Sequence, residues 1–195
     1  QAGQSMTARE LIELAIIRSS NPATDALLAV VGGPQAVNRW IRNAGIGEMR
    51  IDRDIATLVR DDGVIDPATK IDARDSATPK AMLRLLTGLH RGEWLSDASR
   101  AVLLNAMARC ETGKRRIRGQ LPEGARVAHK TGTLSNTASD VGFIHTPDGR
   151  TMAVAIYVTG QGGKPNRDAR IATIARTIYD GYLTESSSQF RSASR

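Results

Sequence analysis

The sequence predicts an α+β (α/β) protein in which a helical region precedes an antiparallel sheet flanked by a C-terminal helix. Three observations predict this fold class. Apolar residues recur at helical spacing through residues 1–111, and short strand-like runs follow within residues 112–184, where a last helical pattern closes the region. The Ser-rich residues 185–195 are expected to be a disordered tail.

The composition excludes several classes of protein. A chain of 195 residues with 41% hydrophobic and 24% charged residues is globular, neither collagen-like nor wholly disordered. No apolar run approaches the ~20 residues of a membrane helix. The single cysteine, Cys110, excludes a disulfide framework and multi-cysteine zinc sites, and we expect no metal and no cofactor. No signal peptide follows Gln1, so we expect a cytosolic protein or a mature or truncated piece.

Two helices are predicted at the start of the chain. Thr7 and Glu10 form a capping box for the first helix, which should end near residues 19–20. Asn21 followed by Pro22 predicts an N-cap and the first position of a second helix, and a Gly-Gly pair ends its apolar stripe.

Three further helices are predicted before the sheet region. One runs from Pro34 with Trp40 directed inward and ends at Gly45. Residues 46–77 are charged and show no clear period, which predicts a long irregular loop of the kind that is uncommon unless functional or disordered. Thr78 and Ser96 then cap two more helices.

The sheet region carries strand-like runs at 127–128, 141–145 and 151–158. The turn at 146–149, with proline and glycine, makes the last two runs an antiparallel hairpin. The terminal helix should lie on this sheet through Ile171, Ile174, Ala175, Ile178 and Tyr182.

Two short motifs could carry chemistry. Ser19-Ser20-Asn21 lies at a helix junction, where its side chains could point into a shared cleft, although serine and asparagine are also ordinary helix caps. Lys130-Thr131-Gly132 follows a strand-like run and would place a cation and a hydroxyl beside backbone that a substrate can approach closely at the glycine. Each motif alone is a weak signal.

Together the motifs form a pattern. Ser-x-Asn at 19–21, Thr-Pro-x-x-Met at 78–82 and Lys-Thr-Gly at 130–132 occur in one order and spacing, with Ile51-Asp52-Arg53 between the first two. In this the chain resembles class A β-lactamases and the related penicillin-binding serine hydrolases over nearly its whole length, from Met6 to Leu183. The resemblance implies a β-lactamase-like fold, acyl transfer on β-lactams through a covalent acyl-enzyme, and a periplasmic or secreted location.

The resemblance also implies roles for individual residues. Ser19 would relay a proton toward the leaving nitrogen, Asn21 would bind the substrate's side-chain amide, and Lys130 would supply positive potential. Thr131 would bind the substrate carboxylate beside Gly132. The resemblance assigns the remaining roles as follows: the N–H of Thr133 is half of an oxyanion hole, Arg116 anchors the carboxylate, and Arg118 and Asp140 are structural. For Arg116 the alternative is a solvated basic loop residue.

The chain departs from the family pattern at the nucleophile. No Ser-x-x-Lys occurs in the sequence, and acyl transfer needs an activated nucleophile with a base in reach. We therefore expect a C-terminal part of a longer enzyme, completed by an N-terminal segment or a complementary chain, with a pseudoenzyme as the alternative. The isolated chain should expose apolar surface where absent elements would pack.

A second departure concerns deacylation. The positions at which the family places the glutamate and asparagine that hold the deacylating water are Ile55 and Val59 here. Asp54 and Asp61 are nearby candidates for a substitute base, although solvated loop carboxylates are the plainer interpretation. We expect slow deacylation.

Two other functions stay open at this point. Within the same superfamily, the missing glutamate leaves room for a D-alanyl-D-alanine carboxypeptidase or esterase. From another class, the net charge of +7 and the run Lys114-Arg115-Arg116 suggest a non-catalytic polyanion-binding module. With 4% aromatic residues and no recognition-helix motif, we expect no specific nucleic acid partner.

Overall fold

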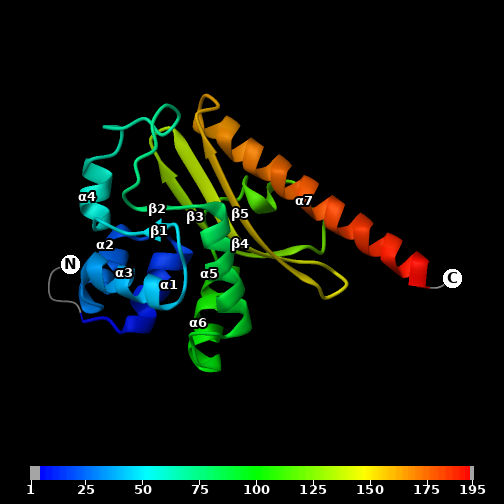
Figure 1. Cartoon of the computed structure of the whole chain (residues 1–195), viewed down its shortest axis with the longest axis horizontal. Helices are drawn as coiled ribbons and strands as arrows, with labels where there is room; N and C mark the ends of the chain where they lie inside the picture. Colours follow the sequence, from blue (N-terminus) through cyan, green and yellow to red (C-terminus); the bar gives the residue numbers. More distant parts are fainter. Residues whose placement is uncertain (1–4, 194–195) are drawn as a thin grey trace.

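A computed structural model describes residues 5–193, with side chains through residue 184. The chain forms helices around an antiparallel sheet, with the long final helix crossing one side of the molecule (Figure 1). The elements in order are α1 (Ala8–Ile17), α2 (Asn21–Val30), α3 (Gly33–Asn43), β1 (Met49–Arg50), α4 (Ile55–Arg60), β2 (Ser76–Ala77), α5 (Pro79–Arg91), α6 (Asp97–Ala108), the 3-10 helix η1 (Ile117–Gly119), β3 (Arg126–Leu134), β4 (Thr137–His145), β5 (Thr151–Thr159) and α7 (Lys164–Ala193).

The helix starts follow the predicted caps with one exception. Thr7 and Glu10 form the capping box of α1, with the Thr7 N–H donating to Glu10 at 2.7 Å. The predicted N-cap Asn21 is wrong by one residue, because Ser20 accepts from the Ala23 N–H at 3.4 Å and Asn21 is already helical. Serine and asparagine are nearly equal as caps, so the sequence alone did not separate them.

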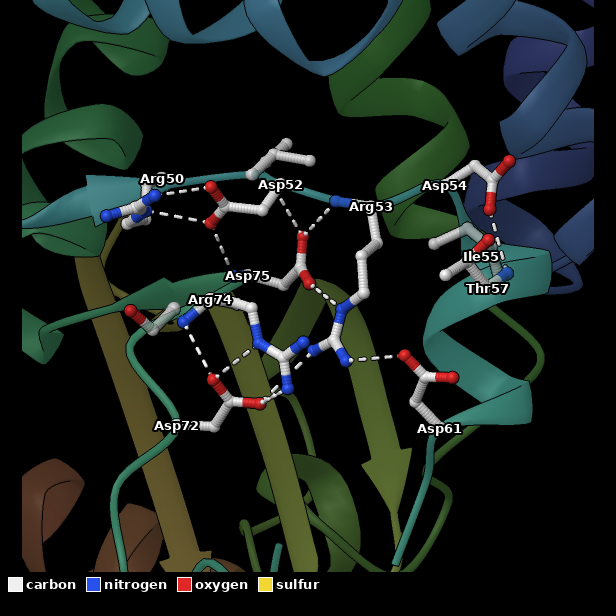
Figure 2. A network of polar contacts seen from close by, with 12 residues as sticks. Arg50, Asp52, Arg53, Asp54, Ile55, Thr57, Asp61, Asp72, Arg74 and Asp75 are labelled. Atoms are coloured by element: carbon white, nitrogen blue, oxygen red, sulfur yellow. Dashed lines mark hydrogen bonds and ion pairs between the residues drawn. The ribbon is translucent and has the colours of Figure 1, made fainter. Parts of the chain in front are cut away.

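The predicted irregular loop at 46–77 contains regular structure. Strands β1 and β2 pair antiparallel across its base, with Met49 opposite Ala77. Helix α4 forms part of the segment that connects the two strands along the chain. Polar contacts organise the rest (Figure 2): the Arg53 Nε donates to Asp75 at 2.6 Å, and that carboxylate also accepts from the N–H groups of Asp52 and Arg53. Hydrophobic periodicity does not report such a network, which is why the sequence showed no order there.

The main sheet has the order β3-β4-β5, antiparallel throughout. The hairpin of β4 and β5 is confirmed, with Val141 opposite Ala155, and the turn at 146–149 closes through the Gly149 N–H and the Thr146 carbonyl. The first strand is longer than predicted and makes a second hairpin with β4, in which Lys130 lies opposite Val141. The second half of β3 is mostly polar, so apolar alternation in the sequence does not indicate the full length of this strand.

Helices cover both faces of this sheet. Helix α7 contacts β4 and β5, while α6 contacts β3 and α5 contacts β5 from the other side (Figure 1). Neighbouring residues of β4 point to opposite faces of the sheet. Ile144 packs in the cluster beneath α7, and Phe143 packs with Leu86 of α5 and Met107 of α6. Alternation with period two therefore builds two cores from one sheet.

The face of α7 against the sheet matches the predicted one only in part. Ile171 and Ala175 are buried as predicted, together with Tyr179, whereas Ile174, Ile178 and Tyr182 are 41%, 40% and 37% exposed. Apolar residues lie at helical spacing on either side of Ile171 and Ala175, so the sequence left the exact rotation of the helix open. The helix also continues through Ala193, where the tail from 185 was expected to be disordered, since elongation adds a hydrogen bond per residue once a helix has formed.

The inward orientation predicted for Trp40 is wrong. Its side chain is 43% exposed and meets Trp94 edge to face, with ring centroids 5.4 Å apart. The next residue, Ile41, is buried with Ile46 and Ala81 in the interior of this region. No helix within the described part of the chain is long and apolar enough to cross a membrane.

Candidate active site

Ser19 and Lys130 come together although 111 residues separate them in the chain. Ser19 lies in the turn between α1 and α2 with a φ of 56°, a left-handed conformation that is uncommon for serine. The Lys130 Nζ, from the middle of β3, donates to the Ser19 Oγ at 2.7 Å and to the Thr131 carbonyl at 2.6 Å. The ammonium group is thus held against the helix junction by two acceptors.

The buried surroundings of Lys130 destabilise its charged form. Burial lowers the pKa of Lys130 below its ordinary value, and the attraction of Cys110 and Asp140 offsets this only in part. A lysine in this state gives up a proton more readily than one in water. The arrangement can therefore both polarise the Ser19 hydroxyl and take part in proton movement.

Asn21 belongs to the same junction. It is the first residue of α2, two positions after Ser19, and its side chain is exposed. The three residues singled out at 19–21 thus divide their tasks: Ser20 caps the helix, while Ser19 meets Lys130. Capping explains the middle residue and leaves the outer two for other roles.

Thr131 and Thr133 are two residues apart on β3, so their side chains lie on the same side of the strand. Thr131 is buried and its Oγ1 lies 2.7 Å from the Thr112 Oγ1, whereas Thr133, next to the end of the strand, is exposed. Strand β3 is an edge strand of the described sheet, so alternate N–H groups along it project away from β4. Such an edge can present backbone donors to a bound molecule beside Gly132.

Arg116 is neither a solvated loop residue nor open to solvent. It is 2% exposed, and its guanidinium donates to Asp168 and to the carbonyls of Gly132 and Ser139. A fourth donor reaches the Thr133 Oγ1 at 2.6 Å. Because arginine has five donors, one is left for another acceptor beside the exposed Thr133. The role that the geometry supports best for Arg116 is to hold the end of β3 in place.

Close approach of the preceding loop depends on Gly113. Its φ is +68°, and a Cβ there would lie 2.4 Å from the Thr131 Cγ2. Glycine alone combines this backbone conformation with such a contact. The loop can therefore place Thr112 and Arg116 directly against β3.

A buried polar cluster beneath β3 was not anticipated from the sequence. The His129 Nδ1 lies 2.7 Å from the Asp140 Oδ1, and the other oxygen of Asp140 accepts from the Ile117 N–H at 3.1 Å. This matches the structural role expected of Asp140. Burial lowers the pKa of His129, but Asp140 and Cys110 outweigh it and raise this pKa to about 9. A lone cysteine and a histidine next to a lysine gave no spacing signal that could have revealed the cluster.

The loop carboxylates are occupied by structural contacts. Asp54 is the N-cap of α4 and accepts from the Thr57 N–H at 2.7 Å, and its contacts with Thr57 lower the pKa of this carboxyl (Figure 2). Asp61 pairs with Arg53 at 3.3 Å. Ile55 lies between them at the first position of α4. The geometry thus favours the plain interpretation of Asp54 and Asp61 over that of a substitute base.

Comparison with known proteins gives a consistent result. The family model described as the β-lactamase enzyme family matches residues 1–182. The chain is 32% identical over 183 residues to the extended-spectrum β-lactamase PER-1 of Pseudomonas aeruginosa, covering 90% of this chain and 57% of that protein. It is 34% identical to the β-lactamase CTX-M-25 of Escherichia coli, covering 91% of this chain and 60% of that protein.

Solved structures agree with the sequence relatives. A variant of the last common ancestor of Gram-negative bacteria β-lactamase class A superposes with a TM-score of 0.85 at 36% identity, covering 94% of this chain and 67% of that one. A β-lactamase from Chitinophaga pinensis gives a TM-score of 0.82 at 31% identity, covering 92% and 66%.

The helices, the antiparallel sheet and the C-terminal helix thus define a class A β-lactamase fold. The chain belongs to the β-lactamase enzyme family. It spans somewhat under two thirds of the length of the curated relatives quoted above. The described residues contain no group of three or more His, Cys, Asp or Glu side chains placed to hold a metal ion.

Proposed function

We propose that this chain is the C-terminal part of a serine β-lactamase, which opens β-lactams through a covalent acyl-enzyme. The single observation that carries the proposal is the 2.7 Å contact between the Lys130 Nζ and the Ser19 Oγ. The named relatives are β-lactamases, which favours this function over a carboxypeptidase, an esterase or a polyanion-binding module. The remaining part of the protein would supply the Ser-x-x-Lys nucleophile.

The contact suits Ser19 for proton relay. In acylation the nucleophile's oxygen bonds to the lactam carbonyl carbon, the C–N bond breaks, and the leaving nitrogen needs a proton. Because the Lys130 ammonium donates to the Ser19 Oγ, the hydroxyl's own proton is free to point at that nitrogen. Ser19 gives up this proton and takes one from the nucleophile side, so its protonation state is restored.

The strand residues suit the other ends of the substrate. The Thr133 N–H would donate to the oxygen on which charge develops, and Thr131 would bind the carboxylate next to Gly132. Asn21, exposed at the start of α2, would bind the side-chain amide. Arg116 supports this subsite from below, since it holds the Thr133 hydroxyl and the Gly132 carbonyl.

Slow deacylation is part of the proposal. Ile55 and Val59 provide no group that can activate water, and the carboxylates of Asp54 and Asp61 are engaged by Thr57 and Arg53. The acyl-enzyme should therefore form faster than it breaks down.

Strand β5 has no partner on its far side in the described sheet, which leaves an edge where the rest of the protein could add strands. We place the whole protein in the periplasm or outside the cell.

Burst kinetics on the whole protein test this function. A chromogenic cephalosporin should give a burst of about one equivalent followed by slow turnover, with the acyl adduct visible by mass spectrometry. Replacing Asp54 and Asp61 by alanine should leave the slow phase unchanged. Absence of any adduct with β-lactams, together with hydrolysis of D-alanyl peptides, would favour the carboxypeptidase instead. DNA binding at low salt without acylation would favour the polyanion-binding module.

A further inference from the structure

A chain of hydrogen-bonding groups runs from the buried interior to the Thr131 hydroxyl. The Cys110 Sγ lies 3.3 Å from the Thr112 Oγ1, which in turn lies 2.7 Å from the Thr131 Oγ1. In both contacts either atom could be the donor. The proposed acylation chemistry uses only the last of these three groups.

The Cys110 end of this series of hydrogen-bonding groups is closed to solvent. Cys110 is 3% exposed, and His129 and Asp140 are fully buried. The His129 Nδ1 lies 2.7 Å from the Asp140 Oδ1, while its Nε2 is buried with no hydrogen-bond partner among the described residues. The nearby His129 ring lowers the pKa of the Cys110 thiol. The thiol therefore has the Thr112 hydroxyl as its hydrogen-bonding neighbour and a histidine close enough to influence its charge.

The protonation state of Cys110 sets the direction in which hydrogen bonds are donated along this series of groups. A hydroxyl has one proton, so Thr112 can donate either to Cys110 or to Thr131 but not to both. A neutral thiol can donate to Thr112, which then donates to Thr131 and leaves the Thr131 proton free to point outward. A thiolate accepts only, so Thr112 turns toward Cys110, Thr131 donates to Thr112, and only lone pairs of Thr131 face outward.

We propose that Cys110 and Thr112 are positioning residues that decide whether the Thr131 hydroxyl donates or accepts at the carboxylate subsite. The inference rests on the proposed function, because it takes Thr131 to bind a substrate carboxylate. A carboxylate needs a donor, so the neutral thiol supports binding and the thiolate opposes it.

The charges around Cys110 place the change near neutral pH. Burial raises the pKa of the thiol, but the contacts with His129 and Thr112 outweigh it and bring this pKa to about 7. His129 is still protonated there, so the proton released by the thiol goes to water. The other charged groups near the cluster are Lys130 on β3, Asp140 on β4, Arg116 from the loop before η1, and the exposed pair of Arg18 and Glu111 at the ends of α1 and α6.

The pH dependence of substrate binding tests the proposal. For the whole protein, KM for acylation by a cephalosporin should rise on the order of ten- to hundredfold as the pH passes through about 7, the loss expected for one hydrogen bond to a charged group. The methyl ester of the same cephalosporin should show no such rise. Cys110→Ser and Thr112→Val should flatten the profile, whereas Thr112→Ser should keep it. An unchanged profile in Cys110→Ser, or an equal rise for the ester, would overturn the proposal.

A second measurement does not depend on catalysis. The ultraviolet absorbance of the thiolate, taken as the difference between the wild-type chain and Cys110→Ala, follows the ionisation of Cys110. Because Thr112 stabilises the thiolate, Thr112→Val should shift this titration upward, and Thr112→Ser should not. An unshifted titration overturns the inference even if acylation occurs. If Thr112→Val shifts the thiol titration but the whole protein is not acylated, the proposed function is wrong. The carboxylate role of Thr131 then falls, and the inference falls with it.

Discussion

The Arg116 Nε donates to the Asp168 Oδ1 at 2.7 Å, and both side chains are buried. This ion pair ties the loop before η1 to the first turns of α7, while the same guanidinium holds the Gly132 carbonyl. Asp168 is also bound by Lys164 at 2.6 Å. The end of β3 that would face a substrate is therefore fixed to the C-terminal helix through one arginine.

Arg116→Ala should destabilise the chain strongly. The substitution leaves Asp168 buried with only Lys164 as partner and removes the donor to two carbonyls, so we expect a loss of about 3–5 kcal/mol in the free energy of unfolding. Urea denaturation measures it. The exposed neighbour provides the control, since Arg115→Ala should change stability by less than about 0.5 kcal/mol. Equal stabilities of the two variants would contradict the bracing role.

Acid should weaken the loop network around Arg53 and Arg74. Hydrogen bonds from Arg74 lower the pKa of Asp72 from 3.8 to about 2 in the folded chain. A carboxyl whose folded pKa is depressed stabilises the fold above its unfolded pKa, and this contribution disappears as the pH falls from about 4 toward 2. Asp72→Asn should therefore lose less stability than the wild type over that range, as measured by denaturation at stepped pH. Solvent exposure makes the difference small, but a variant that loses as much as the wild type would exclude the effect.

Two glycine substitutions separate a steric contact from backbone strain. Gly113 and Gly45 both have a φ of +68°, but only at Gly113 would a Cβ meet another group, the Thr131 Cγ2 at 2.4 Å. Gly45→Ala should cost about 1 kcal/mol for its conformation alone, and Gly113→Ala should cost more. Thermal or chemical unfolding measures the difference. Similar losses at both sites would mean that the loop moves freely away from β3.

Ile55→Glu should accelerate deacylation in the whole protein. The substitution puts a carboxylate at the first position of α4, where the family resemblance places the residue that activates water. We expect the slow phase after the burst to become faster by about 10²-fold, the lower end of the range for general base catalysis. Ile55→Gln is the matched control and should leave it unchanged. If glutamine is as effective as glutamate, base catalysis is not the cause.

Sequence patterns predicted the elements whose apolar residues are periodic. The caps at Thr7, Thr78 and Ser96 and the hairpin of β4 and β5 are confirmed. The pattern failed where polar contacts provide the order, as around Arg53, or where two helix stripes were equally apolar, as on α7. Local patterns carry no information about the pairing of charges distant in the chain.

The candidate site shows the same division. The motifs at Ser19 and Lys130 were visible because their order matches a family pattern, and the structure brings the two side chains together. The burial of Arg116 and the cluster of His129, Asp140 and Cys110 were not visible. These depend on how the loop, β3 and β4 stack, which residue spacing in one chain does not specify.

The acylation rate of the whole protein in a double-mutant cycle of Ser19 and Lys130 tests the central claim most directly. If the pair acts as a unit, Ser19→Ala and Lys130→Ala should each slow the burst with a chromogenic cephalosporin by about 10²- to 10⁴-fold, and the double variant should be little slower than either. Lys114→Ala, at an exposed position, should acylate normally. Normal acylation in either single variant, or losses that multiply in the double variant, would contradict the account.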